Sequence, residues 1–410
     1  MTLSVEERYL RLGLQIGRHV ERVVDSYFGP PELAAEVVAA SPADPKKLVT
    51  AADGLLDELG DGWLRDQVVG LRTYAGVLAG ESISFADEAF GCYGVRPNYT
   101  DEAVFEDGHE RLEELLSGTG SLAMRYRFWE EAMAVPSAML EQTLVTAIET
   151  ARRVTGDIID LPEDEGVNVD TARDVNWMAY CKYLGNKQSR ISVNLDRTLS
   201  AVEVLTIATH EAYPGHHTER SCKEQLLVRN RNQLEETIVL IPTPQSLIAE
   251  GIGRTATALM LEGARGIELE AVIHETGIEL DLAHAVAVQR SHEVCGWAVV
   301  NAALMLDERK SGQAEATEYL ERWGLVTPEI AVHLVRYIVD PTSRTYVITY
   351  LAGQALCEGF VAGDKARFSR LLTDQLRVRD LTESRRGRVT PAANSRSIGV
   401  CGNRPGITRE

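Results

Sequence analysis

The sequence predicts a mainly α-helical fold with one small β element. Apolar residues recur every three to four positions over most of the 410-residue chain, which is the pattern of helices that bury one face. β-branched and aromatic residues gather around a turn motif at residues 174–196, which is typical of a β-hairpin. No run of eighteen apolar residues occurs, so we expect no membrane-spanning helix.

Five helices are expected before the hairpin. The first covers residues 4–27, where Tyr9, Leu12 and Ile16 share one face and the segment FGPPEL follows. The others are expected at residues 44–60, 62–80 and 100–118, and from Pro136 to about Arg153. Residues 156–172 are acidic and lack helical periodicity, so they are interpreted as a loop.

The hairpin and the helices after it have clear boundary signals. The two strands are expected at residues 174–183 and 189–196, on either side of the turn LGNK. Ser200 and Glu203 form a capping box at the start of the next helix. A further helix begins with Thr243 as its cap and Pro244 at its first position, and helical patterns continue to about Arg379.

The chain is expected to fold as one unit with two regions. Residues 1–155 form an N-terminal helical region, and residues 156–380 carry the candidate site and pack against it. Residues 381–410 contain six arginines and two glutamates, a net charge of +4, in a stretch rich in Ser, Gly and Pro. We interpret this tail as disordered rather than as a functional basic arm.

Charge and cysteine usage narrow the class of protein. The net charge of −19 and the pI near 5.0 repel nucleic-acid phosphate, so a nucleic-acid partner is not expected. The N-terminus lacks the apolar core of a signal peptide. The six cysteines are scattered without a CxxC pair, which fits reduced thiols in the cytoplasm better than a disulfide framework.

Three of the nine histidines lie close together in the segment ATHEAYPGHHTE. His210 followed by Glu211 resembles the start of a zinc-peptidase helix, in which the second histidine comes four residues after the first. Pro214 takes that position here, and histidines follow at His216 and His217. The other His-Glu pairs, His274–Glu275 and His292–Glu293, have no second histidine nearby and are interpreted as ordinary polar residues.

Pro214 prevents a regular helix through this segment. It has no N–H, and its ring would clash with the carbonyl group of His210. In a straight helix His217 would lie about 10 Å beyond His210, too far for both to bind one zinc ion. A kink or wide turn at Pro214–Gly215 would bring His216 or His217 back to His210. The alternative is a kinked helix that ends in polar residues and binds no metal.

Two carboxylates lie in apolar surroundings that call for compensation. Glu211 follows an apolar stripe, where a metal-activated water would stabilise it as a general base. Glu250 is the only acid in an apolar helix and is the candidate third metal ligand. The alternative for Glu250 is a salt bridge to Arg254, four residues later on the same helix.

These motifs resemble the bacterial domain-of-unknown-function family 885, which is related to the gluzincin zinc metallopeptidases. The resemblance rests on HEAYPGHH, on the apolar helix with EG at 250–251, and on the early segment VVDSYFGPPEL. It implies a multi-helix peptidase-like fold in which His210, His216 and Glu250 bind Zn²⁺ and Glu211 acts as general base. It favours His216 over His217 as the second ligand.

The resemblance also suggests residues that contact the substrate. The segment DPTSRTYVITYLAG is similar to a Tyr-x-x-Gly segment of the family, so Tyr350 is the first candidate for the oxyanion donor. Tyr346 and Arg344 are the next candidates. Core packing for Tyr350 and an ion pair for Arg344 are the alternatives. Gluzincins bind substrate along an edge strand, which suggests a role for SRISVNLD and its Asn194; the alternative is a plain structural strand. His217 and Tyr346 are the other candidates for substrate contact.

Three functions are compatible with the sequence. The first is a zinc-dependent hydrolase that cleaves peptide bonds. The second is a metallohydrolase of a non-peptide amide or ester, with the same catalytic groups and a different pocket. The third is a non-catalytic binding protein that keeps the fold, against which the presence of Glu211 argues, because ligand binding alone does not require that carboxylate.

Overall fold

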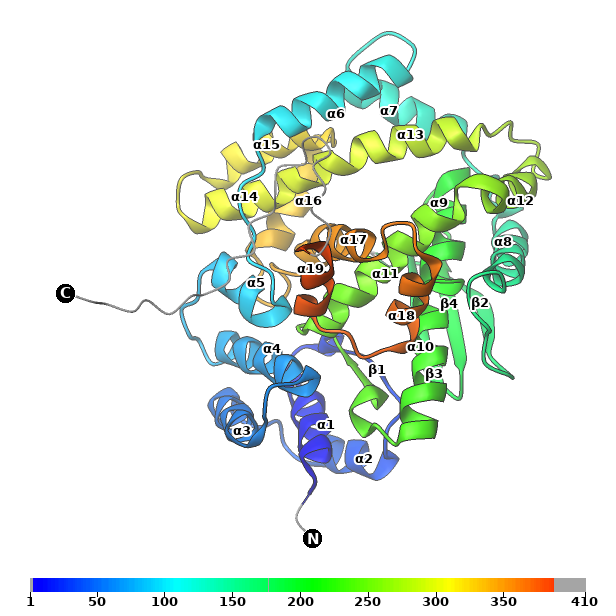
Figure 1. The fold of residues 1–410 in the computed structure, drawn as a ribbon. Helices are drawn as coiled ribbons and strands as arrows, with labels where there is room; N and C mark the ends of the chain where they lie inside the picture. The colour runs from blue at the N-terminus through cyan, green and yellow to red at the C-terminus, as the bar shows by residue number, and fades with distance from the viewer. Residues whose placement is uncertain (1–2, 176, 387–410) are drawn as a thin grey trace.

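The computed structural model describes residues 3–175 and 177–386 of the chain. The fold is mainly helical, as predicted, and its strands form a two-stranded and a three-stranded sheet (Figure 1). The helices of the N-terminal part are α1 (Val5–Ile16), α2 (Pro31–Ala39), α3 (Pro45–Glu58), α4 (Trp63–Leu78), α5 (Phe85–Tyr93), α6 (Glu102–Leu115), α7 (Leu122–Ala132) and α8 (Leu140–Thr155).

The first predicted helix is shorter than expected. The α1 helix ends at Ile16, and β1 (Val24–Tyr27) follows where the helix was predicted to continue. This strand pairs antiparallel with β5 (Ile238–Leu240), which is fully buried. The β-branched residues before and within β1 suit this pairing, which a helical periodicity argument cannot anticipate because the partner lies more than 200 residues away.

The predicted hairpin is present, but its sheet has a third strand. β3 (Ala179–Gly185) and β4 (Gln188–Asn194) pair antiparallel, close to the predicted positions. The interpretation of residues 156–172 as a loop was wrong at its end, because β2 (Gly166–Ala172) pairs parallel with β4. The strand order is β2-β4-β3, so the segment predicted as an edge strand lies in the centre of the sheet and β3 lies at an edge.

The second half of the chain is almost entirely helical. The capping box of Ser200 and Glu203 is present, and Pro244 begins a helix after Thr243, as predicted. The helices are α9 (Ala201–Ile207), α10 (His216–Lys223), α11 (Pro244–Met260), α12 (Gly263–His274), α13 (Leu282–Glu293), α14 (Trp297–Asp307), α15 (Gln313–Gly324), α16 (Pro328–Val339), α17 (Val347–Val361), α18 (Lys365–Thr373) and α19 (Val378–Arg386).

The start of the predicted disordered tail is ordered. Residues 381–386 belong to α19, and residues 387–410 lie outside the described part of the chain. In the described residues, no helix is both long and apolar enough to cross a membrane. The cysteines of this part of the chain are buried free thiols: Cys92, Cys181, Cys222, Cys295 and Cys357.

Helices α11 and α17 lie side by side at the centre of the molecule (Figure 1). They approach closely because glycines face one another. A Cβ atom added to Gly251 would lie 2.3 Å from the carbonyl oxygen of Gly353, and one added to Gly353 would lie 2.3 Å from that of Leu247. The largest core cluster includes residues from Tyr9 to Ala352, so helices from both ends of the chain share it.

We predict that Gly251→Ala lowers the free energy of unfolding by about 2–3 kcal/mol, because the added methyl group forces the two backbones apart. Gly54→Ala is the matched control: Gly54 lies within α3 with open space around its Cα, so alanine should stabilise the protein by up to about 1 kcal/mol. Urea denaturation of both variants measures the effects. Equal free energies of unfolding in Gly251→Ala and Gly54→Ala would contradict the close α11–α17 contact.

Candidate metal centre

The helix that carries His210 does not continue past Ala212. After α9, residues Ala208–Ala212 form a π-helical turn that closes when the backbone N–H of Tyr213 donates to the carbonyl oxygen of Ala208 at 3.1 Å. The Tyr213–Pro214 peptide bond is cis, and a new helix, α10, begins with Gly215 as its N-cap. The helix is therefore interrupted between the two histidine-bearing turns.

Glycine at position 215 makes this interruption possible. A Cβ atom at Gly215 would lie 1.8 Å from the carbonyl oxygen of His210, so any side chain would collide with that backbone. The rings of His210 and His216 meet edge to face, with centroids 4.6 Å apart. The prediction that a break at Pro214–Gly215 brings His216 back to His210 is confirmed.

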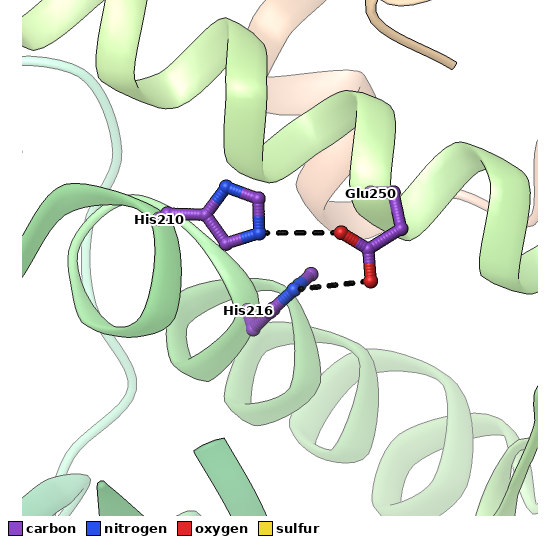
Figure 2. Close-up of side chains that lie close together, drawn as sticks. All are labelled: His210, His216 and Glu250. Atoms are coloured by element: carbon purple, nitrogen blue, oxygen red, sulfur yellow. Dashed lines mark ion pairs between the residues drawn. The ribbon is translucent and has the colours of Figure 1, made fainter. Parts of the chain in front are cut away.

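Glu250 on α11 faces both histidines (Figure 2). Its Oε2 atom lies 3.3 Å from Nε2 of His210, and its Oε1 atom lies 3.8 Å from Nε2 of His216. Each residue offers one ligand atom, and these three atoms lie within 4.8 Å of one another. Two ligand atoms on a tetrahedral metal ion with bonds of about 2.0 Å lie about 3.3 Å apart, so the three groups could hold a metal ion after a small contraction.

Neighbouring residues hold these three side chains in place. A Cβ atom at Gly253 would lie 2.5 Å from Cε1 of His210, so this glycine on α11 provides the space for the imidazole ring. The hydroxyl of Tyr346 donates a hydrogen bond to Oε1 of Glu250 at 2.8 Å. Glu250 Oε2 is buried and accepts no hydrogen bond from the described residues, which leaves a lone pair for a cation.

The electrostatics of the site suit a cation. Although burial opposes ionisation, the imidazoles of His210 and His216 and the hydroxyl of Tyr346 lower the pKa of Glu250 to about 2. Burial and the neighbouring His210 lower the pKa of His216 to about 4. At neutral pH the ionised carboxylate of Glu250 and the neutral imidazole of His216 therefore face the same point. Burial opposes protonation of His210, but the carboxylates of Glu250 and Glu211 raise its pKa, so a metal ion competes with a proton for that ring.

Glu211 lies beside this group in the same cavity. Burial raises the pKa of Glu211 to about 7, with smaller contributions from the negative charges of Glu250 and Asp25. The backbone N–H of Cys181, on the edge strand β3, donates a hydrogen bond to the Glu211 carboxylate. A carboxyl group with a pKa near 7 can both accept and donate a proton at neutral pH.

The cavity has a volume of about 140 Å³ and is lined by residues from both sheets and from α10, α11 and α17. Sequence reasoning found its two histidines, its two glutamates and the tyrosines of α17, but it missed six polar lining residues: Asp25, Tyr180, Cys181, Tyr183, Arg220 and Ser246. Arg220 and Ser246 could have been found, because each lies four residues from a predicted ligand on the same helix. The others reach the cavity through strand pairing, which leaves no local signal.

Tyr346 and Tyr350 both line the cavity. Their rings meet edge to face, with centroids 5.4 Å apart. The hydroxyl of Tyr346 donates to Glu250, whereas Tyr350 is 36% exposed as a residue. The core-packing alternative for Tyr350 therefore does not apply.

The structure does not bring Arg344, a predicted catalytic residue, to the other site residues; it forms the ion pair that was its alternative. Arg344 does not line the cavity. Its Nε donates to Glu88 at 2.7 Å, its side chain also reaches Asp307 at 3.4 Å, and it donates to the carbonyl oxygen of Ile83 at 2.8 Å. Glu88 lies 256 residues away in the sequence, so the sequence gave no sign of this partly buried ion pair.

Asn194 and His217, for which substrate contacts were predicted, do not line the cavity either. Asn194 is 2% exposed, and its amide donates to the carbonyl oxygens of Val175 and Trp177, so it holds a loop. His217 is fully buried and bonds to Ser189 at 2.8 Å and to Glu165 at 2.7 Å. Because His217 is the first residue after His216 on α10, its ring points away from the cavity and anchors the helix.

The alternative partner for Glu250 is not used. Arg254 pairs with Glu293 at 3.3 Å instead. The other two His-Glu pairs of the sequence, His274–Glu275 and His292–Glu293, do not line the cavity. The ring of His292 stacks on Tyr126 in another part of the fold.

No family profile and no curated protein matches the chain. Among solved structures, the fold is similar to that of the "putative lipoprotein from Colwellia psychrerythraea", with a TM-score of 0.53 and 13% sequence identity. The match covers 87% of this chain and 69% of that chain. At this identity the likeness concerns the fold alone, so function has to be inferred from the site.

We predict that the protein titrated with Zn²⁺ binds one ion per chain, and that Glu250→Ala and His216→Ala each weaken binding by more than about 100-fold, since each removes a ligand. Calorimetric titration and metal analysis after desalting measure the affinity and the stoichiometry. His274→Gln is the control, because His274 is exposed and outside the cavity, and it should bind zinc normally. Undiminished binding in Glu250→Ala would contradict the assignment.

Proposed function

We propose that the protein is a zinc-dependent hydrolase that cleaves amide bonds in peptides. The observation that carries this proposal is the convergence of His210, His216 and Glu250 on one point, with the Glu211 carboxyl group facing the same cavity. Two imidazoles and one carboxylate form the donor set of catalytic zinc sites that keep an open position. The proposal extends to a gluzincin-like fold and to the relationship with the domain-of-unknown-function family 885.

Glu211 acts as the general base. Zn²⁺ bound by the three ligands would polarise the scissile carbonyl group and make the attacking water more acidic. Glu211 accepts a proton from this water as the water oxygen bonds to the carbonyl carbon. The same carboxyl group then donates the proton to the amide nitrogen as the C–N bond breaks, which its pKa of about 7 allows.

The two tyrosines have different roles in this proposal. Tyr350, which is accessible from the cavity, donates a hydrogen bond to the oxyanion that develops on the carbonyl oxygen. Tyr346 orients the ligand Glu250 through its 2.8 Å hydrogen bond and does not act on the substrate.

A second candidate function is the hydrolysis of a small non-peptide amide or ester. The cavity of about 140 Å³ favours it, because typical ligand pockets measure about 300–1,000 Å³. A cleavage assay with the zinc-loaded protein on a peptide library and on a panel of small amides and esters separates the two functions. A protein that binds zinc and hydrolyses neither class would be a non-catalytic binding protein.

We predict that Glu211→Gln lowers kcat by about 10²–10⁴-fold without loss of zinc, because it removes the proton acceptor and none of the ligands. Steady-state kinetics and metal analysis measure the two effects. Glu275→Gln is the matched control, because Glu275 also follows a histidine but is exposed outside the cavity. Full activity in Glu211→Gln would refute the role of this residue.

Phenylalanine substitutions separate the roles of the two tyrosines. We expect Tyr350→Phe to lower kcat about 100-fold with little change in KM or zinc affinity, because an oxyanion donor acts only in the transition state. We expect Tyr346→Phe to weaken zinc binding by about 10–100-fold, because Glu250 loses the group that orients it. If Tyr350→Phe leaves kcat unchanged, another group stabilises the oxyanion.

A further inference from the structure

Arg220 lines the cavity without a partner for its guanidinium group. It lies on α10 one turn after His216. Among the residues that the structure describes, none forms a hydrogen bond or an ion pair with it. Other arginines near the site are paired: Arg152 with Glu165, Arg229 with Glu224 and Arg344 with Glu88.

The acids whose charges act most strongly on Arg220, which are Glu219, Asp25 and Glu236, form no hydrogen bond with it. Asp25, which also lines the cavity, accepts a hydrogen bond from the hydroxyl of Tyr180 at 3.1 Å. Glu219 accepts one from Lys223 at 2.7 Å. Arg220 therefore keeps its planar set of N–H donors free toward the cavity, and this set matches a carboxylate in two parallel hydrogen bonds.

The position of Arg220 sets its distance from the proposed reaction centre. Four residues of α-helix correspond to a rise of about 6 Å from His216, and side chains on a helix lean back toward its N-terminus. A peptide extends by at most about 3.3–3.6 Å per residue. A carboxylate bound by Arg220 then lies one or two residues beyond the scissile carbonyl group.

We propose that Arg220 binds the free α-carboxylate of a short peptide, so that the protein removes residues from the C-terminal end. This inference rests on the proposed peptidase function. The small cavity supports it, because about 140 Å³ accommodates the end of a chain better than a segment that enters and leaves. It makes Arg220 a specificity-determining residue rather than a catalytic one.

The competing role for Arg220 is to offset the negative charges of Asp25 and Glu219. The two roles give different results in binding. If Arg220 recognises a carboxylate, its removal affects only ligands that have one. If Arg220 only balances the charges of the protein, its removal weakens the binding of all ligands alike or lowers the stability of the fold.

Binding of two ligands that differ only at the C-terminus tests the proposal. Zinc-loaded protein with Glu211→Gln, which prevents turnover, is titrated calorimetrically with Ala-Ala and with its C-terminal amide. We expect Ala-Ala to bind about 10- to 100-fold more tightly than the amide. The added substitution Arg220→Met should abolish this preference, and Arg220→Lys should retain only part of it, because lysine presents a single point charge.

Arg229→Met is the matched control, because Arg229 is paired with Glu224 and does not line the cavity, so it should keep the preference. Thermal unfolding and zinc content confirm that each variant is folded. A preference that persists in Arg220→Met, or equal binding of both ligands before that substitution, overturns the proposal. A preference that depends on Arg220 in a protein that cleaves no peptide supports the carboxylate site and refutes the peptidase function.

Discussion

The contact between the backbones of Gly215 and His210 is the constraint on which the site depends. It is possible only because residue 215 has no side chain, and it accompanies a break of the helix between Ala212 and His216. The break gives His216 the first position of a new helix, with its ring against that of His210 instead of more than a turn and a half away along one axis. The direction of α10 then follows, and with it the side on which Arg220 projects.

A second glycine contact fixes the opposite wall. Gly251 and Gly353 let α11 and α17 approach at backbone distance, which places Tyr346 against Glu250. Gly253, two residues further along α11, accommodates the ring of His210. Helix α11 and the segment that carries His210 therefore pack closely because glycines leave space at their contacts. The ligands come from rigid helices rather than loops, which suits a site that requires positions accurate to about 0.5 Å.

Local reasoning predicted the parts of the site whose signals lie within a few residues. Pro214, Gly215 and the late His216 specify a break that can be understood from the chain itself, and an isolated acid in an apolar helix marks Glu250. The same reasoning could not predict which residues are brought to the cavity, or held away from it, by contacts between distant parts of the chain. Asp25 lines the cavity because β1 pairs with β5. Arg344 lies outside it because it forms an ion pair with Glu88. The partners lie more than 200 residues apart, so no local pattern identifies them.

Charge balance links the candidate metal centre with the proposed carboxylate site. Glu211, Glu250 and Asp25 place three carboxyl groups around one small cavity in a chain of net charge −19. A peptide end that carries its own carboxylate is repelled there unless positive charge offsets these groups. In the proposal, a divalent cation would offset Glu250 and Glu211, and Arg220 would provide a second positive charge. An uncharged peptide segment gains nothing from the second of these charges, so the arrangement favours a chain terminus over the interior of a chain.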